Sequence, residues 1–288
     1  MAPPQFGDIT DSIADVWDRA GFGDDKKVKI QFKTPEVYGG AITVSEEVKG
    51  VTDFSKGFAT KISAKWEHAS GFSINKLDND LKKGTVLETS FDKFSAVPGL
   101  AVGCNMNMSY GDKGSTTFPL EVTYENDIVA AGLSTTTALK DVTADLTLAT
   151  EGLMVGTQLQ YKGGDLKDYP ITLKYSASDY EAALQASKNL SVFGLLTKYK
   201  ASKELTLASY VSVPDYPTKA VLCGVYNLGG DYKTKVAGQC SYEKGKKDNT
   251  LECSVVSKPL KGVEFGSSVV LPVANLGAYK YGFSFKLG

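Results

Sequence analysis

Several residue types are scarce in this chain of 288 residues. It contains one histidine, His68, four cysteines, and 32 basic against 33 acidic side chains. A single histidine leaves little material for zinc sites or for acid/base chemistry by paired histidines. The cysteines, at positions 104, 223, 240 and 253, are too sparse for a Cys-x-x-Cys metal motif or a disulfide framework. Because there is no basic excess to neutralise phosphates, nucleic acid is not expected as a partner.

Long apolar runs are missing as well. No uninterrupted stretch approaches the roughly 18–20 residues of a membrane helix, which argues against a helical membrane protein and a secretory signal. The glycine-rich phosphate and dinucleotide motifs and the His-Glu-x-x-His motif are also absent, so we expect neither an enzyme nor a bound cofactor or metal. The composition does not exclude a transmembrane β-barrel. The strands of such a barrel alternate apolar and polar residues, so their average hydropathy is that of a soluble protein.

Apolar and polar residues alternate almost everywhere from residue 26 onward, the pattern of β-strands whose two faces meet different environments. Short turn signals, among them Asp78-Asn79 and Gly163-Gly164, separate the segments. No linker or shift of composition interrupts them, so we expect one domain over residues 1–288, in which the strands close on themselves or stack in two layers. The cleanest alternation is the last, with apolar Tyr279, Tyr281, Phe283, Phe285 and Leu287.

The composition of the apolar face favours a membrane barrel over a soluble β-rich binding protein. This face mixes small, aliphatic and aromatic residues, and the aromatic residues often stand near strand ends, as at Trp66, Tyr124 and Tyr161. A lipid-facing band with aromatic girdles has this composition, although a soluble barrel can also show it.

Residues 5–20 break the period of two and predict an amphipathic α-helix. Their apolar residues share one stripe and four aspartates occupy the other side, with Asp8 as the expected N-cap and Gly21 and Gly23 as the stop. The helix could pack on a soluble barrel, lie on a membrane surface, or sit inside a lumen with its apolar stripe against the wall. The stripe consists of Phe6, Ile9, Ile13, Val16, Trp17 and Ala20, and the acids are Asp8, Asp11, Asp15 and Asp18.

Such a helix, ending in Gly21-Phe22-Gly23 and followed only by amphipathic strands, resembles the start of the mitochondrial porins, the voltage-dependent anion channels. The central stretch from Ala149 to Gln158 is similar to a degenerate form of the family's Gly-Tyr-Glu-Gly segment. The end of the chain fits the sorting signal of outer-membrane barrels, with Lys280, Gly282, Phe285 and Leu287. At the start, the matching positions are Phe6, Asp8, Ile9, Ser12, Asp15, Val16, Trp17 and Arg19.

The resemblance covers essentially the whole chain and implies an all-β membrane barrel of about 19 strands over residues 26–288, with helix 5–20 in the lumen. An odd number implies that the first and last strands close the barrel in parallel. The implied function is a voltage-gated, weakly selective diffusion channel of the mitochondrial outer membrane, passing small ions and anionic metabolites such as nucleotides. Membrane lipids are the implied partners, and a homo-oligomer and kinase or apoptosis-type protein partners are left open.

If the apolar positions face lipid, their alternates line the pore, and 12 lysines against nine acids give a wall of about +3. Water and salt screen such charges over roughly 8–10 Å, so we expect a mild selectivity. The lysines are Lys29, Lys33, Lys61, Lys65, Lys162, Lys174, Lys198, Lys200, Lys233, Lys235, Lys280 and Lys286, and the acids are Glu88, Asp92, Glu121, Glu125, Asp145, Glu151, Glu181, Glu252 and Glu264.

Three departures from the family pattern carry predictions. Asp11 and Ala14 occupy helix positions where the family usually has basic residues, which leaves the helix at about −3, with Arg19 as its one basic residue. We therefore expect a weaker anion preference than the family norm. Gly21 and Gly23 are candidates for a gating hinge, or only for a helix stop. Alignment through Gly71-Phe72 puts Lys76 where many family members have a membrane-facing Glu, so its side chain is expected to reach toward the membrane interface.

The remaining alternatives are a protein-import pore of the same superfamily, which normally carries a longer N-terminal extension, and a soluble lipid- or sugar-binding β-barrel. His68 is expected in a turn after Trp66 with no special role. Cys104, Cys240 and Cys253 alternate with apolar residues and are expected on the lipid-facing side.

Overall fold

The computed structural model describes residues 2–18, 26–33, 40–49, 59–80, 84–110, 114–136, 140–213, 219–229, 234–243 and 249–287. Two short helical segments, η1 (Phe6–Asp8) and α1 (Asp11–Asp18), precede the strands, and a third, η3 (Leu276–Ala278), precedes the last strand. The strands are β1 (Lys26–Lys33), β2 (Gly40–Lys49), β3 (Ala59–His68), β4 (Phe72–Asp80), β5 (Gly84–Phe91), β6 (Leu100–Ser109), β7 (Thr116–Thr117), β8 (Pro119–Glu125), β9 (Val129–Thr136), β10 (Asp141–Thr150), β11 (Leu153–Lys162), β12 (Asp165–Asp168), β13 (Ile171–Ser176), β14 (Tyr180–Ser187), β15 (Val192–Lys200), β16 (Leu205–Val213), β17 (Lys219–Gly229), β18 (Thr234–Glu243), β19 (Thr250–Leu260), β20 (Val263–Pro272) and β21 (Lys280–Leu287).

The strands form one closed sheet. Consecutive strands pair antiparallel, and β1 pairs with β21 in parallel, from Lys26 opposite Phe283 to Ile30 opposite Leu287. Since β7 and β8 both pair with β6, and β12 and β13 both pair with β11, each of these pairs is one interrupted strand. The 21 described segments therefore make 19 barrel strands, which confirms the predicted count and the parallel closure.

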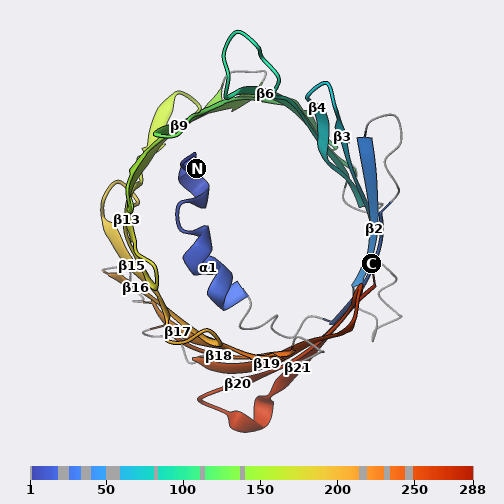
Figure 1. Cartoon of the computed structure of the whole chain (residues 1–288), viewed down its shortest axis with the longest axis vertical. Helices are drawn as coiled ribbons and strands as arrows, with labels where there is room; N and C mark the ends of the chain where they lie inside the picture. The colour runs from blue at the N-terminus through green and yellow to red at the C-terminus, as the bar shows by residue number, and fades with distance from the viewer. Residues whose placement is uncertain are drawn as a thin grey trace.

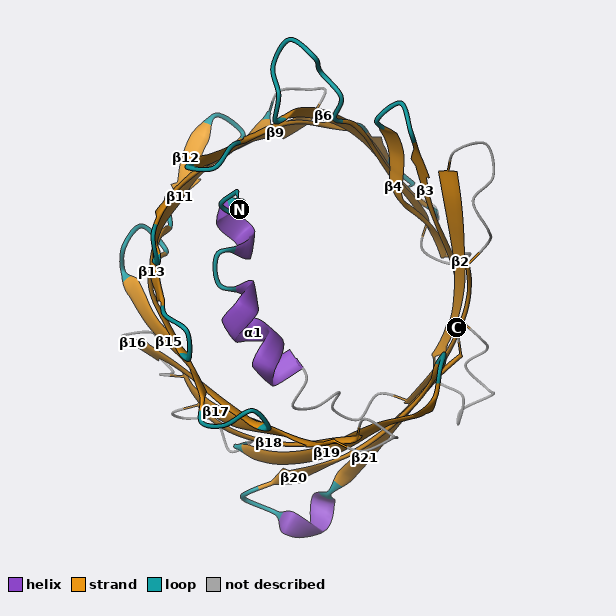
Figure 2. Cartoon of the chain, viewed as in Figure 1, coloured by secondary structure: helices purple, strands orange, loops and turns teal. Residues whose placement is uncertain are grey.

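The ring encloses a lumen that holds η1 and α1 (Figures 1 and 2). The alternation predicted from the sequence sorts the side chains between the two faces of this ring. On β13, Leu173 and Tyr175 are exposed at 41% and 52%, whereas Thr172 and Lys174, which point inward, are buried. A soluble barrel packs its apolar side chains inside, so the exposed apolar exterior is that of a membrane barrel. Within the described residues, no helix is both long and apolar enough to cross a bilayer.

Because consecutive strands are antiparallel, the turns lie at two rims of the barrel. We call the rim beside the N-terminal end of the chain proximal and the other rim distal. The proximal rim carries the turns at residues 126–128, 151–152, 177–179 and 201–204. A cavity of about 550 Å³ lies between Pro3 and Pro4 and the first two of these turns, so the N-terminal end is at this rim. The distal rim carries the turns at 163–164, 188–191 and 273–279, and β1 and β21 both begin toward it.

At the distal rim, the turn between β14 and β15 has an unusual backbone. Lys188, Asn189 and Leu190 all have positive φ angles, of 50°, 55° and 63°. The backbone N–H groups of Lys188, Asn189 and Tyr169 donate hydrogen bonds to the Asp168 carboxylate, at 3.1, 2.8 and 2.8 Å. One carboxylate thus stabilises a left-handed turn that costs energy in residues other than glycine.

Several local predictions were wrong. The segment expected as one helix from 5 to 20 is instead the 3₁₀ turn η1 followed by α1, so Asp8 is not an N-cap. The Asp8 and Ile9 N–H groups donate to the Gln5 and Phe6 carbonyls, the short-range bonding of a 3₁₀ turn. Asp78-Asn79 is no turn but lies inside β4, where Asp78 is opposite Ser63 of β3.

His68 ends β3 and is not in the turn that follows. Its ring Nδ1 lies 2.8 Å from the Ser70 hydroxyl. The strand therefore continues two residues beyond Trp66, and the side chain of its last residue bonds to the start of the turn.

Candidate functional site

The N-terminal segment lies along the inner wall and is the most elaborate feature of the lumen (Figure 1). The turn η1 contacts β10 and β11, and α1 contacts β15, β16 and β17. Ile9, Ile13 and Val16 are 1%, 0% and 5% exposed. Burial of each such side chain stabilises by at most about 1.5–3 kcal/mol, so the stripe is a substantial part of the docking energy. The wall residues beneath Ile13 and Val16 are Ala183, Leu196, Ala208, Cys223, Val225 and Ala237.

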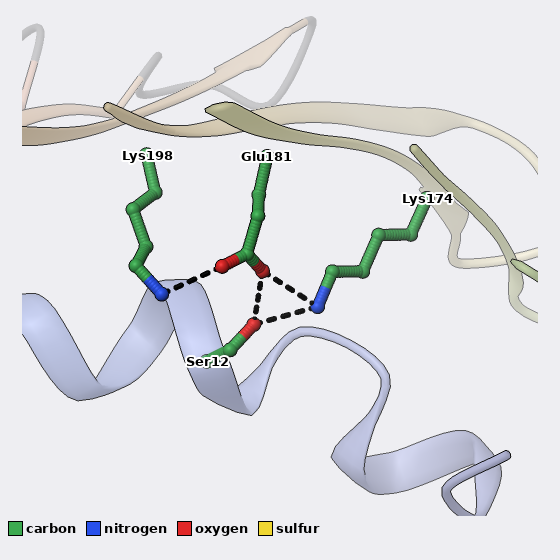
Figure 3. A network of polar contacts seen from close by, with 4 residues as sticks. All are labelled: Ser12, Lys174, Glu181 and Lys198. Carbon is green, nitrogen blue, oxygen red and sulfur yellow. Dashed lines mark hydrogen bonds and ion pairs between the residues drawn. The ribbon is translucent and has the colours of Figure 1, made fainter. Parts of the chain in front are cut away.

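A polar network that we call the helix clamp joins α1 to the wall; it consists of Ser12, Lys174, Glu181 and Lys198 (Figure 3). The Lys174 ammonium donates to the Ser12 hydroxyl at 2.6 Å and pairs with Glu181 at 2.9 Å. Lys198 donates to the other oxygen of Glu181 at 2.6 Å, and the Ser12 hydroxyl donates to Glu181. The side chains of Lys174, Glu181 and Lys198 are 6%, 16% and 15% exposed. One carboxylate on β14 therefore balances two lysines from its neighbouring strands and holds the helix through Ser12.

A second attachment holds the residues before the helix. The Phe6 N–H donates to Asp145 at 3.4 Å, and the Gln5 amide donates to Glu125 at 3.1 Å. Two wall glycines permit this close approach. A Cβ at Gly156 would lie 2.4 Å from Ile9 Cδ1, and one at Gly132 would lie 2.9 Å from Gln5 Oε1. The sequence gave no sign of this contact, because it depends on which strands the segment crosses.

The acidic side of the N-terminal segment faces the lumen, as the sequence predicted for a helix held inside a barrel. Asp8, Asp11 and Asp15 are exposed, on the side away from the buried stripe. Partial burial raises the pKa of Asp11, and the neighbouring charges of Asp8 and Asp15 raise it further, against the opposing charge of Lys174. The segment thus keeps a dense negative charge next to the wall.

The wall under α1 is basic. Lys174 and Lys198 belong to the helix clamp, and a cavity of about 200 Å³ between α1 and β15–β18 is lined by Lys198, Lys200 and Lys235, with Asp15 on the helix side. Elsewhere, the described wall carries inward acids. The strand registers place Glu121 and Glu125 of β8 on the face of Asp145, and Glu88 of β5 follows on the same face. Helix α1, which carries Asp11 and Asp15, therefore lies over a basic part of the described wall.

Lys76 differs from its prediction. A β-bulge between Ile74 and Lys76 shifts the register of β4, so that Lys76 is opposite Glu88. Its ammonium pairs with Glu88 at 3.3 Å and with Asp78 at 3.6 Å. The extra residue of the bulge turns Lys76 to the lumen face, and the expected reach toward the membrane interface is wrong.

The other predicted site residues divide into three groups. Ile9, Ile13, Val16, Lys174 and Lys198 meet at the docked segment, Asp15 and Lys235 line the cavity beside it, and Asp11 is exposed. The sorting-signal positions Lys280, Gly282, Phe285 and Leu287 all belong to β21, and the Phe285 ring lies 4.8 Å from that of Phe265. The remaining predicted site residues lie outside the described part of the structure. Arg19, Gly21, Gly23 and Lys233 are not among the described residues, and for Trp17, Lys29, Lys61 and Lys65 only the backbone is described.

The four cysteines are free thiols. Cys104, Cys240 and Cys253 are exposed on the outer face, where the alternation placed them. Cys223 is buried beneath Ile13 and Val16. The sequence offered no role for Cys223, yet it is the thiol that the docked helix covers.

A closed sheet with an apolar exterior and a charged lumen defines the porin class of fold. The chain matches no protein-family model and no curated protein. Among solved structures it is similar to variants of the porin of Rhodopseudomonas blastica. One variant has a TM-score of 0.52 at 10% identity, covering 91% of this chain and 96% of the porin. Another has a TM-score of 0.52 at 11% identity, covering 92% and 97%. At such low identity, the similarity shows a shared fold.

Proposed function

We propose that the chain is a single pore-forming unit, a diffusion channel of the voltage-dependent anion channel family in the mitochondrial outer membrane. In this proposal it passes small ions and metabolites such as nucleotides with weak selectivity. The observation that carries it is a charged N-terminal segment held inside a closed barrel whose outer face is apolar. Over its described residues, the segment does not contact the outer face of the barrel. It lies inside the lumen, where it changes the width and the charge of the path for permeants.

Voltage gating is part of the proposal and rests on the helix clamp. A change of membrane potential acts on charges that can move, and the N-terminal segment carries four aspartates. It is attached by a few polar contacts and one apolar stripe, so it forms a separate element that can adopt a second position. Gly21 and Gly23 are the proposed hinge.

The proposed selectivity follows from the arrangement of charges. Lys174 and Lys198 are partly neutralised by Glu181, and the exposed aspartates of the segment face the pore above them. An anion that passes this wall meets the aspartates as well as the lysines. We therefore expect an anion preference weaker than the family norm, and one that falls further as salt screens the charges.

Reconstitution of the full chain into planar bilayers tests the function. We expect stepwise single-channel currents, reduced in steps at high potential of either sign, and a reversal potential close to zero in a KCl gradient. The triple variant D8N/D11N/D15N should shift the reversal potential toward that of chloride. The variant E121Q removes a lumen acid of β8 as a comparison. Absence of stepwise currents refutes the channel, and strong anion preference in the unaltered chain refutes the charge argument.

Location is tested separately. Carbonate extraction of mitochondria should leave the protein in the membrane pellet, and protease treatment of intact mitochondria should place it in the outer membrane. A channel that conducts in bilayers but fractionates with another membrane would refute the location and leave the channel standing.

A further inference from the structure

The connection between β20 and β21, residues 273–279, is longer than the distal turns at residues 163–164 and 188–191. It contains no charged residue. The turn between β11 and β12 is only Gly163-Gly164, and the turn between β14 and β15 begins with Lys188. Turns at the rim of a barrel normally contact water. Seven uncharged residues with three large apolar side chains indicate instead that this connection contacts an apolar or interfacial environment.

The connection exposes its large apolar side chains. Leu276 lies in the 3₁₀ turn η3, Val273 precedes this turn and Tyr279 follows it. Val273, Leu276 and Tyr279 are 57%, 63% and 61% exposed. The backbone of the connection is hydrogen-bonded: the Val273 N–H donates to the Asn249 carbonyl at 2.7 Å and the Ala278 N–H to the Asn275 carbonyl at 3.0 Å. A bonded backbone therefore carries these exposed apolar side chains.

The position of the connection, outside the ring of strands, indicates what its apolar side chains contact. Figure 1 shows η3 outside the ring of strands, away from the lumen and next to the outer face of β20 and β21. The outer face of β20 and β21 is apolar too, since its residues Tyr281 and Phe265 are exposed at 54% and 49%. An apolar surface continuous with the lipid-facing wall, and placed at its rim, meets the headgroup region of the bilayer.

We propose that residues 273–279 form an interfacial anchor, in which Val273, Leu276 and Tyr279 insert into the headgroup and upper acyl region of the leaflet at the distal rim. Tyrosine suits this depth because its ring is apolar and its hydroxyl stays at the polar level. The partner is the phospholipid surface itself. The proposal needs the barrel to be in a bilayer and does not need it to conduct, so it can fail while the proposed function holds.

The anchor has a structural use at the closure of the barrel. The β1–β21 pairing has five register pairs and begins at Phe283, whereas β20 and β21 share eight, from Lys280 onward. Over the described residues, the distal end of β21 thus extends beyond its pairing with β1. A lipid contact at the adjoining connection would hold this end in the plane of the wall.

A tryptophan reporter tests the proposal. The two native tryptophans, Trp17 and Trp66, are replaced by phenylalanine, and Leu276→Trp is introduced. The control is Asp165→Trp in the same background, at the start of β12 beside a turn of the same rim and on the lumen face of the wall. Both chains are reconstituted into phosphatidylcholine vesicles, with and without lipids brominated near the top of the acyl chains. Far-UV circular dichroism and protease resistance verify that the barrel is intact.

We expect blue-shifted emission for the Leu276→Trp chain and about two-fold quenching by the brominated lipid, since an interfacial anchor lies roughly 5–10 Å into the headgroup and acyl boundary. The Asp165→Trp chain should emit as in water and be quenched little. Equal quenching of the two overturns the proposal, because any tryptophan at this rim would then reach the lipid. Water-like, unquenched emission at position 276 overturns it too, and points to a protein partner on this surface.

Discussion

Loss of the Glu181 charge should release the helix from the wall. In the unaltered chain this carboxylate balances Lys174 and Lys198 and accepts from Ser12. Glu181→Gln leaves two lysines side by side with no counter-charge, in a place where Lys174 is 6% exposed. Removal of one member of a buried charge cluster costs about 3–5 kcal/mol. We take about 3 kcal/mol, since Glu181 and Lys198 keep some contact with water.

This loss weakens the docked state without abolishing it. The stripe of Ile9, Ile13 and Val16 still stabilises docking, by at most roughly 5–9 kcal/mol in total. A change of about 3 kcal/mol raises the undocked population roughly 100-fold. The helix should therefore remain bound most of the time but open far more often.

Cys223 provides the assay, because it is 2% exposed beneath the helix and points into the lumen. The three outer cysteines, Cys104, Cys240 and Cys253, are replaced by alanine, and the rate at which a water-soluble maleimide labels Cys223 in reconstituted barrels is measured. Glu181→Gln should raise this rate roughly 100-fold, if labelling follows brief opening. Glu121→Gln, which removes the same charge from β8, outside the helix clamp, should leave it unchanged.

Two results would refute the reasoning. An unchanged labelling rate in Glu181→Gln would mean that the helix clamp contributes nothing to docking. An equal rise in Glu121→Gln would mean that lumen charge as a whole, and not the clamp, governs access to Cys223.

Further predictions concern the other contacts of the lumen and the rim. Gly156→Leu should displace η1 and raise Cys223 labelling, because even a Cβ there would lie 2.4 Å from the Ile9 side chain; Gly238→Leu, whose nearest neighbour would be 3.9 Å away, should not. Asp11→Asn should slow the labelling at neutral pH, because partial burial in the docked segment raises the pKa of Asp11 and so disfavours its charged form there. Asp168→Ala should lower the stability of the barrel against denaturant by about 1–3 kcal/mol, because three backbone N–H groups lose their acceptor, whereas Asp165→Ala on the same strand should change it little.

The sequence predicted the barrel well because a period of two is a property of every strand. Alternation assigned Lys174 to the lumen face, and the structure has it buried there while its neighbour Leu173 is exposed on the outer face. A different pattern, the helical spacing of residues 5–20, predicted the apolar stripe of Ile9, Ile13 and Val16, and these side chains are buried against the wall. The strand count and the parallel closure came from the family resemblance, because alternation alone does not say where a sheet ends.

The errors share one cause: a local sequence pattern does not show which neighbouring strand or wall residue a side chain will meet. The bulge before Lys76 is a relation between β4 and β5, and one extra residue moves the side chain to the other face. The interruption of the helix at residues 9–10 and the close fit at Gly156 likewise depend on the wall that the segment crosses. In the helix clamp, Ser12 is more than 160 residues from Lys174 and Glu181 in sequence, so no spacing could pair the helix with its wall partners.

The odd number of barrel strands determines where the two ends of the chain can be reached. β21 begins toward the distal rim and finishes at Leu287 near the proximal one, and the N-terminal segment runs through the lumen until Pro3 lies beside the proximal turns. Both ends are therefore presented to the same compartment. An epitope or fluorophore on either end would report one side of the membrane, and a probe for the opposite side has to be placed in a distal turn such as 163–164.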